Sequence, residues 1–334
     1  MNKTYFITLT PYDLYFFGGE QEQIADYYLK GNSIPQQTAL LGMLRYQILL
    51  QNGLLENNRI KDDVDAAKWI GKESFQYSNA TQTFGKVDSI SSCYLVEKTD
   101  TDTKKYLPTH PVYMEGWEVI DGNYFLPSYD PKKYYRLRWK NIENPNDVVD
   151  DFFDEVERVG VDKNYTGQTD NDSFYKQVWL KLSICRENVN HDFSFGFYVT
   201  IADDVKLENA NVNLGKENSV FRMSVIEETA SDEVHEPNAN AIVLVCDAYV
   251  DPEILQQCDF AVCDTLPFRN LVNQTAKTHN HYDLHKSTTL LQLLKRGTIL
   301  IANDSKQIEA IGNSLNKYAN FVKIGYNKFQ TIKI

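Results

Sequence analysis

The sequence predicts an α+β fold, and three observations carry this prediction. Tyrosine and phenylalanine are abundant, with 21 and 17 copies, and aromatic residues favour sheets over helical bundles. Each half of the 334-residue chain contains strand-like segments separated by helices of ordinary length. Between the halves, the segment from Asp154 to Leu182 reads as a long β-ribbon. We therefore expect two ferredoxin-like (RRM-like) domains, at 1–148 and 183–334, with the ribbon inserted at 149–182.

The N-terminal half is expected to begin with a short strand, from Tyr5 to Thr10. The strongest helix signal follows, from Pro35 to Gln51, where Ser33 and Gln36 have the spacing of a capping box. Gly42 lies inside this apolar helix and costs about 1 kcal/mol of helix propensity relative to alanine. The expected compensation is a close approach of the helix to a sheet or to another backbone.

Arg45 is the one charge inside the same apolar run. An unpaired buried guanidinium is very costly, so the residue needs an explanation. One interpretation is a structural ion pair or a side chain that extends its charged end to the surface. The other is a phosphate contact beside a groove.

The predicted ribbon is rich in β-branched residues on its first strand, at Val156, Val159 and Val161. Its second strand is aromatic and aliphatic, from Phe174 to Leu182, and a polar tip from Lys163 to Ser173 joins the two. Long polar tips build little core of their own and usually serve a partner.

The C-terminal half is expected to alternate strands with one clear helix, from Ser305 to Tyr318. The strands are expected at Phe193 to Ile201, Phe221 to Ile226, Ala241 to Val245 and Thr298 to Ala302. The tail from Phe321 to Ile334 reads as an alternating strand that breaks at 325–328 and resumes at Phe329.

The overall charge of the chain restricts the classes of function that it can have. The net charge of −12 argues against a free-standing nucleic-acid binder, because phosphate binding needs a basic surface. It leaves open a subunit with a local basic groove for RNA and an acidic face for proteins. The basic and aromatic segment PKKYYRLRW, from Pro131 to Trp139, is either such a surface or an edge strand protected by charge.

Cysteine usage and the lack of targeting signals predict a cytoplasmic protein. The five cysteines are odd in number, widely spaced and without a C-x-x-C pair, which favours reduced thiols. The N-terminus lacks the apolar region of a signal peptide, and no apolar run approaches the roughly 18 residues of a membrane span.

No strong catalytic motif is present. His279, His281 and His285 are close in sequence and could serve a metal or act as a general base for RNA cleavage, but their spacing matches no strong metal signature. Phosphate-loop, dinucleotide, nucleophile-elbow and zinc-protease motifs are absent. The acidic run from Glu143 to Glu157 reads as a solvated face. We expect no metal and no cofactor.

Four separated segments together carry a family resemblance. They are TPYDLYFFGGE (10–20), IPQQTALLGMLRYQIL (34–49), the ribbon with Glu155, Arg158, Val159, Gly160, Val161, Thr169, Phe174 and Tyr175, and a C-terminal set of NLGKENS (213–219), KRGTILI (295–301) and IGYNKF (324–329). In this order they resemble the third subunit of the Cmr complex, the type III-B CRISPR effector, which belongs to the RAMP superfamily.

The resemblance implies a fold, an activity and partners. It implies two RRM-like folds with no nuclease activity of their own, which hold the 5′ tag of the guide RNA. The ribbon then acts as a thumb that pushes between bases near the start of the guide–target duplex. Expected partners are the guide tag, the target RNA, the large subunit with palm-type cyclase domains, and the first copy of the backbone RAMP subunit.

Carried onto this sequence, the resemblance places tag contacts on the helix and the tail and further cations on the ribbon. The expected RNA contacts are Gln36, Gln37, Thr38, Arg45, Lys323, Tyr326, Asn327 and Lys328, with Arg158 and Lys163 on the thumb and Arg136 in the basic segment. Two departures put phosphate contacts in doubt: Lys216 stands where a second glycine is common, and the first loop lacks the family's usual arginine after its aromatic pair.

Two rival functions stay open. One is a RAMP endoribonuclease that processes guide precursors, with His279, His281 or His285 as acid or base. The other is a purely structural adaptor that makes no contact with RNA.

Overall fold

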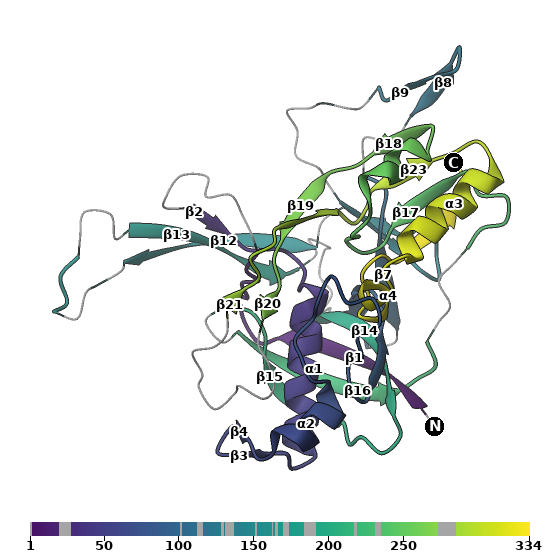
Figure 1. Ribbon diagram of the computed structural model, residues 1–334. Coiled ribbons are helices and arrows are strands. Elements are labelled where there is room, and N and C mark those ends of the chain that lie inside the picture. Colours follow the sequence, from purple (N-terminus) through teal and green to yellow (C-terminus); the bar gives the residue numbers. More distant parts are fainter. Residues whose placement is uncertain are drawn as a thin grey trace.

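A large antiparallel sheet forms the centre of the protein in the computed structural model (Figure 1). The structure describes residues 2–19, 28–100, 102–111, 116–127, 130, 137–150, 152–161, 163, 166–169, 174–183, 192–216, 219–230, 235–272 and 285–334. The order across the nine-stranded sheet is β11 (Val148–Val149), β10 (Arg138–Asn141), β7 (Thr103–Thr109), β6 (Tyr94–Lys98), β14 (Asp192–Ala202), β1 (Asn2–Pro11), β16 (Val220–Glu227) and β15 (Ala210–Asn213), and β5 (Val87–Ile90) also pairs with β14.

The large sheet takes strands from both sides of the domain boundary expected at residue 183. β1 pairs with β14 on one edge, from Asn2 opposite Ala202, and with β16 on the other, up to Pro11 opposite Phe221. The mixed helix and strand content agrees with the predicted α+β class, while two ferredoxin-like domains stay a prediction.

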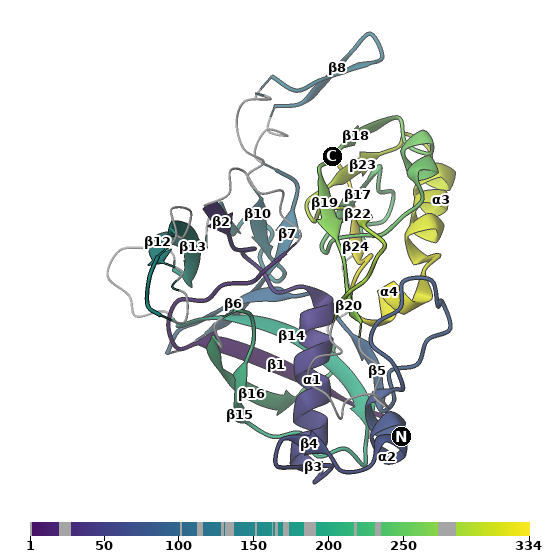
Figure 2. The same cartoon turned by 60° about the vertical axis from the view of Figure 1, so that its left-hand side comes forward.

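Helix α1 (Gln37–Gln51) lies across one face of this sheet (Figure 2). Its apolar side, with Leu40, Leu44 and Ile48, shares one core with inward-facing side chains of the sheet such as Ile7 and Phe197. Helix α2 (Asp63–Ile70) follows after the short hairpin of β3 (Leu55–Glu56) and β4 (Arg59–Ile60).

The expected capping box at the start of α1 is wrong. The helix begins at Gln37, and the side chain of its N-cap residue, Gln36, makes no capping hydrogen bond. The end of α1 follows the sequence signal more closely, because Asn52 and Gly53 close it with hydrogen bonds to the carbonyls of Ile48 and Leu50.

A second, smaller sheet forms a C-terminal lobe. Its order is β18 (Phe260–Val262), β23 (Ile299–Ile301), β17 (Ala241–Leu244) and β24 (Phe329–Ile332). Helix α3 (Ser305–Asn316) begins with a capping box from Asp304 and packs Ile311 and Leu315 against this sheet. The turn η3 (Pro252–Gln256), the pair β19 (Thr265–Phe268) with β22 (Leu291–Leu294), and the pair β20 (Leu271–Val272) with β21 (His285–Lys286) complete the lobe.

The strand expected at the start of the tail is wrong. The chain instead forms a short helix, α4 (Ala319–Lys323), in which the amides of Phe321 and Val322 donate to the carbonyl of Tyr318. Phe321 is buried in the main core, so tertiary packing overrides the alternating pattern there.

The predicted ribbon is confirmed. Strands β12 (Phe153–Val161) and β13 (Phe174–Leu182) pair antiparallel from Phe153 opposite Leu182 to Val161 opposite Phe174, and they project from the body of the protein (Figure 1). The sequence did not indicate a third strand, β2 (Tyr28–Lys30), which pairs parallel with β13 near the body. A separate hairpin of β8 (Glu118–Ile120) and β9 (Asn123–Phe125) lies between β7 and β10 in the chain, and Tyr124 stacks on Phe260 of the C-terminal lobe.

Candidate functional site

The exposed side of α1 forms one wall of a groove of about 750 Å³, which we call the α1 groove. Five separate parts of the chain line it: α1 with the residue before it, the first loop at Gly18 and Gly19, the turn at Gly215 and Lys216, and the segments 74–75 and 269–271. Two of the segments that carry the family resemblance, the first loop and the Gly215 turn, therefore meet a third, α1, in space.

The α1 groove is positively charged. Among the described residues that line it, the charged ones are Arg45, Lys216 and Arg269, and none of them carries a carboxylate. The rest of the lining is apolar or carries hydroxyl and amide groups, as at Thr38 and Asn270. A groove with three cations and no lining carboxylate suits a polyanion, in a protein that is acidic overall.

Arg45 sits at the floor of the groove with much of its hydrogen-bonding capacity unused. Its Nη2 donates to the carbonyl of Glu73 at 3.0 Å, and the guanidinium lies 5.7 Å from the ring centre of Phe84. Its Nε is buried without a hydrogen-bond partner among the described residues, and no carboxylate in the described part of the chain pairs with it. Burial lowers the pKa of Arg45 to about 10, so the side chain is a desolvated cation at neutral pH.

Gly42 keeps the groove open. The expected close approach of another backbone at this position is wrong, because a Cβ built on Gly42 would meet nothing within 4 Å. The residue is exposed and lines the groove instead. A side chain at this position would therefore enter the groove without displacing the fold.

The first loop and the Gly215 turn are held together by backbone contacts. The amide of Lys216 donates to the carbonyl of Phe16 at 2.8 Å, and Gly215 has a φ of +96°. A Cβ on Gly215 would lie 2.5 Å from the same carbonyl, so only glycine allows this approach. This contact fixes Lys216 at the rim of the groove, where its Nζ lies 5.8 Å from the ring centre of Phe16.

The three predicted residues at the start of α1 divide between surface and core. Gln36 and Thr38 line the groove. Gln37 is fully buried, and its amide lies among Cys246, Cys93 and the carbonyl of Ile324. Gln37 therefore joins α1 to the tail from beneath the groove.

Two of the predicted tail contacts are buried and already have structural roles. Asn327 has a φ of +60°, and its amide donates to the carbonyls of Tyr249 and Leu315 at 2.8 and 2.7 Å. Tyr326 is 1% exposed and packs edge-on against Phe321 and Phe268. Both residues are therefore part of the core, and Asn327 joins the end of α3 to the segment around Tyr249.

Lys323 is exposed and Lys328 is half-buried, and neither lines the α1 groove. The tail reaches the start of α1 through Gly325, where a Cβ would lie 2.2 Å from the carbonyl of Ser91 and 3.0 Å from Cδ of Gln37. The structure thus brings the helix and the tail together, but the tail meets the helix from its buried side.

The two predicted ribbon cations are exposed and separate from the α1 groove. The guanidinium of Arg158 lies 4.7 Å from the ring centre of Trp179, and Lys163 is exposed at the start of the tip. Arg136 lies outside the described residues, as do His279 and His281, and the side chain of His285 is likewise not described.

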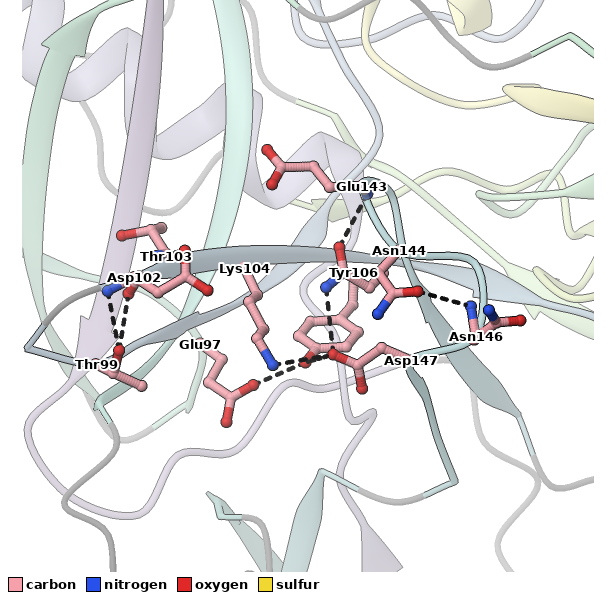
Figure 3. Close-up of polar contacts among 11 residues, drawn as sticks. Glu97, Thr99, Asp102, Thr103, Lys104, Tyr106, Glu143, Asn144, Asn146 and Asp147 are labelled. Atoms are coloured by element: carbon pink, nitrogen blue, oxygen red, sulfur yellow. Dashed lines mark hydrogen bonds and ion pairs between the residues drawn. The ribbon is translucent and has the colours of Figure 1, made fainter.

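Part of the acidic run expected to be a solvated face is a structural network (Figure 3). Tyr106 on β7 donates its hydroxyl toward Glu97 at 2.7 Å and toward Asp147 at 3.0 Å. Lys104 and Asn141 also donate to Asp147, at 3.1 and 3.2 Å. Burial opposes ionisation of Asp147, but these donors hold its pKa below the ordinary value. The network ties β6, β7 and β10 together and does not border the groove.

Sequence reasoning missed Arg269 as a groove residue. Arg269 follows β19, and its neighbours Asn270 and Leu271 also line the groove. The amide of Asn270 donates to the carbonyl of Phe75, which fixes this segment beside α1. No local motif marks Arg269, because its place in the groove depends on contacts between segments almost 200 residues apart.

Among the described residues, no group of three His, Cys, Asp or Glu side chains has the geometry to hold a metal ion. The cysteines there, Cys93, Cys246, Cys258 and Cys263, are free. No helix in this part of the chain is long and apolar enough to cross a membrane.

Comparison with known proteins gives a likeness in fold. No protein-family model and no curated protein sequence matches the chain. A chain in a cryo-EM structure of the type III-B Cmr-beta bound to cognate target RNA and AMPPnP, state 1, is 12% identical with a TM-score of 0.52, over 98% of this chain and 99% of that one. A chain in a structure of the type III-B Cmr-beta bound to cognate target RNA is 13% identical with a TM-score of 0.53, over 98% and 96%.

Proposed function

We propose that this protein is a non-catalytic RNA-binding subunit of a type III-B CRISPR effector complex. In this role it holds the 5′ tag of the guide RNA in the α1 groove. The observation that carries the proposal is the groove itself. It joins the first loop, α1 and the Gly215 turn, three segments that resemble the third Cmr subunit, and its described lining residues include three cations and no carboxylate.

The chemistry of the groove supports a single-stranded RNA ligand. Lysine and arginine side chains and backbone amides position phosphates, while groove width and neutral polar groups accommodate sugars and bases. Arg45 adds a desolvated cation to the lining of the groove, and a phosphate bound there would neutralise its charge. The net charge of −12 fits a subunit whose other faces meet protein rather than RNA.

The fold likeness to chains in Cmr-beta structures supports a place in such a complex. We infer that the neighbours are the large palm-domain subunit and the first backbone RAMP subunit, in the cytoplasm. The ribbon projects away from the body and presents Arg158 and Lys163, so we assign it the role of a thumb that enters the guide–target duplex.

Guide loading into the assembled complex tests this function. Arg45→Gln and Lys216→Gln are expected to weaken loading, and each should reduce the steepness of the salt dependence by about one phosphate contact. Lys306→Gln is the matched control, because Lys306 is exposed on α3 and outside the groove. Unchanged loading and salt dependence in both groove variants would remove the groove from the proposal.

A second experiment tests the absence of catalysis. The purified chain, incubated with repeat RNA in the presence of a chelator, is expected to leave that RNA intact. Cleavage that is lost on replacing His279, His281 or His285 would favour the endoribonuclease instead. If no residue of the chain crosslinks to the guide in the complex, the adaptor role is correct.

A further inference from the structure

A second cleft, outside the α1 groove, lies at the base of the ribbon. It has a volume of about 480 Å³ and lies between one face of β12 and β13 and the chain that follows β1. We call it the ribbon cleft. Its walls come from residues 12–14, from residues 158–160 of β12, from Tyr175, Gln177 and Trp179 of β13, and from Ser219 and Val220.

The ribbon side of this cleft is a preformed aromatic surface. Gly160 and Tyr175 are opposite each other in the ladder, and a Cβ on Gly160 would lie 2.2 Å from the Tyr175 ring. Tyr175 therefore lies over Gly160 because no side chain stands there. The Arg158 guanidinium lies 4.7 Å from the ring centre of Trp179, which extends this π-surface.

A buried amide supplies hydrogen-bond donors to the same surface. Gln177 is 5% exposed and lines the cleft. Its Oε1 accepts from Nε1 of Trp179 at 3.1 Å, and this bond fixes the side-chain orientation. The Nε2 group then donates to no described residue. Because Gln177 lines the cleft, a ligand bound there can accept a hydrogen bond from this group.

The body side of the cleft contributes a second ring. Tyr12 is 60% exposed, yet its hydroxyl is anchored by donation to Oδ1 of Asn211 at 2.8 Å. An exposed aromatic ring that is fixed at one end offers a stacking face at little entropic cost. Among the described residues that line the cleft, the charged ones are Arg158 and Asp13, so their charges cancel.

We propose that the ribbon cleft receives one unpaired nucleobase of the bound RNA. Aromatic rings and a guanidinium plane stack on a base, and the Gln177 amide donates to an acceptor on the base edge. A phenylalanine or tryptophan side chain of a partner protein fits less well, because phenylalanine has no acceptor for this amide and the indole nitrogen of tryptophan is itself a donor.

The position of the cleft connects it to the proposed RNA path. The turn that contributes Gly215 and Lys216 to the α1 groove continues to Ser219 and Val220 in the ribbon cleft. Five residues of chain span at most about 17 Å. One RNA strand can therefore reach both sites within a few nucleotides. The inference rests on the proposed RNA-binding function, but it concerns different residues.

An abasic scan of the guide and target strands tests this site in the assembled complex. Removing the base that enters the cleft is expected to weaken RNA binding about tenfold, as loss of one stacked base does. Tyr12→Ala should weaken binding to intact RNA by a similar factor. In Tyr12→Ala, removal of the same base should have little further effect. Tyr12→Phe is the matched control: it keeps the ring and loses only the bond to Asn211, so it should retain most of the binding.

Several outcomes would overturn the inference. One is that the loss of RNA binding caused by Tyr12→Ala adds to the loss caused by every abasic position, which would mean that no single base depends on Tyr12. Another is a crosslink from Tyr12 or Tyr175 to a partner protein instead of RNA. If Arg45→Gln and Lys216→Gln still impair guide loading, the ribbon-cleft inference fails alone. If they do not, the proposed function fails with it.

Discussion

Replacing Arg45 with methionine is expected to stabilise the free protein while it weakens RNA binding. Arg45 is a half-buried cation that no described carboxylate neutralises, and methionine has a similar length without the charge. Replacing a desolvated charge by an apolar side chain of similar volume is often neutral or stabilising. A residue kept for ligand binding should show this opposition between stability and function.

The size of the expected stability gain in Arg45→Met follows from the pKa of Arg45. The fall of this pKa from its ordinary value to about 10 corresponds to a desolvation cost of about 3 kcal/mol in the folded protein. Loss of the hydrogen bond to Glu73 and of the contact with Phe84 offsets about 2 kcal/mol of this cost. The net expectation is a gain of about 1 kcal/mol, or a thermal midpoint higher by about 2 °C.

The direction of the Arg45 pKa shift also predicts how the stability difference between Arg45→Met and the parent depends on pH. Burial lowers the pKa of Arg45 in the folded state, so the cost is fully present below about pH 10 and is relieved only as pH rises above that value. The difference in thermal midpoint between Arg45→Met and the parent should therefore be constant from pH 6 to pH 9.

Thermal unfolding of the purified chain, with and without guide-tag RNA, measures both effects. RNA should raise the midpoint of the parent more than that of Arg45→Met, because a bound ligand stabilises in proportion to its affinity. Arg59→Met is the control, since Arg59 is exposed on β4 and should change neither quantity. A loss of more than about 2 kcal/mol in Arg45→Met with unchanged RNA affinity would mean that Arg45 is a structural residue.

Further variants address the groove floor, the core and the ribbon. Gly42→Leu should weaken RNA binding by filling the α1 groove, while the thermal midpoint stays equal or rises because glycine is a poor helix former. Asn327→Ala should lower stability by about 3 kcal/mol in denaturant titration, because it leaves buried backbone groups unpaired, and Asn327→Gly, which suits the positive φ, should be less harmful. Burial alone would raise the pKa of Asp247, but Arg296 holds it below the ordinary value, so this pair stabilises above about pH 4 and the contribution is lost as pH falls further. Asp247→Asn should remove that acid-side dependence in a thermal scan against pH. Deleting residues 163–172 should leave guide loading intact and disturb target pairing near the tag, and unchanged target pairing would refute the thumb role.

The sequence predicts local elements well where one periodicity dominates. The ribbon strands, α3 and the body of α1 follow their hydrophobic patterns to within a few residues. The two errors at the start of α1 and at Phe321 arise where tertiary contacts replace a local signal. A capping spacing at Ser33 and Gln36 did not form its bonds, and an alternating pattern at the tail became helix α4.

The candidate site was only partly accessible from the sequence. Of the predicted contacts on α1, Gln36, Thr38 and Arg45 line the groove, because helix periodicity places them on its exposed side. Tyr326 and Asn327 resemble an exposed turn in sequence, yet a left-handed asparagine with three hydrogen bonds makes them part of the core. Lys216 and Arg269 reach the groove through packing between distant segments, which no local pattern encodes.

The pairing of β1 has a consequence for biogenesis. This strand is made first, but both of its sheet neighbours lie about 200 residues later, at Ala202 and Phe221. At ordinary ribosomal speeds of about 5–20 residues per second, β1 waits roughly 10–40 s with both edges open. Such long-range closure is slow, and open apolar edges can pair with other nascent chains. Closing the central sheet is therefore the step of synthesis at which chaperones should matter most for this protein.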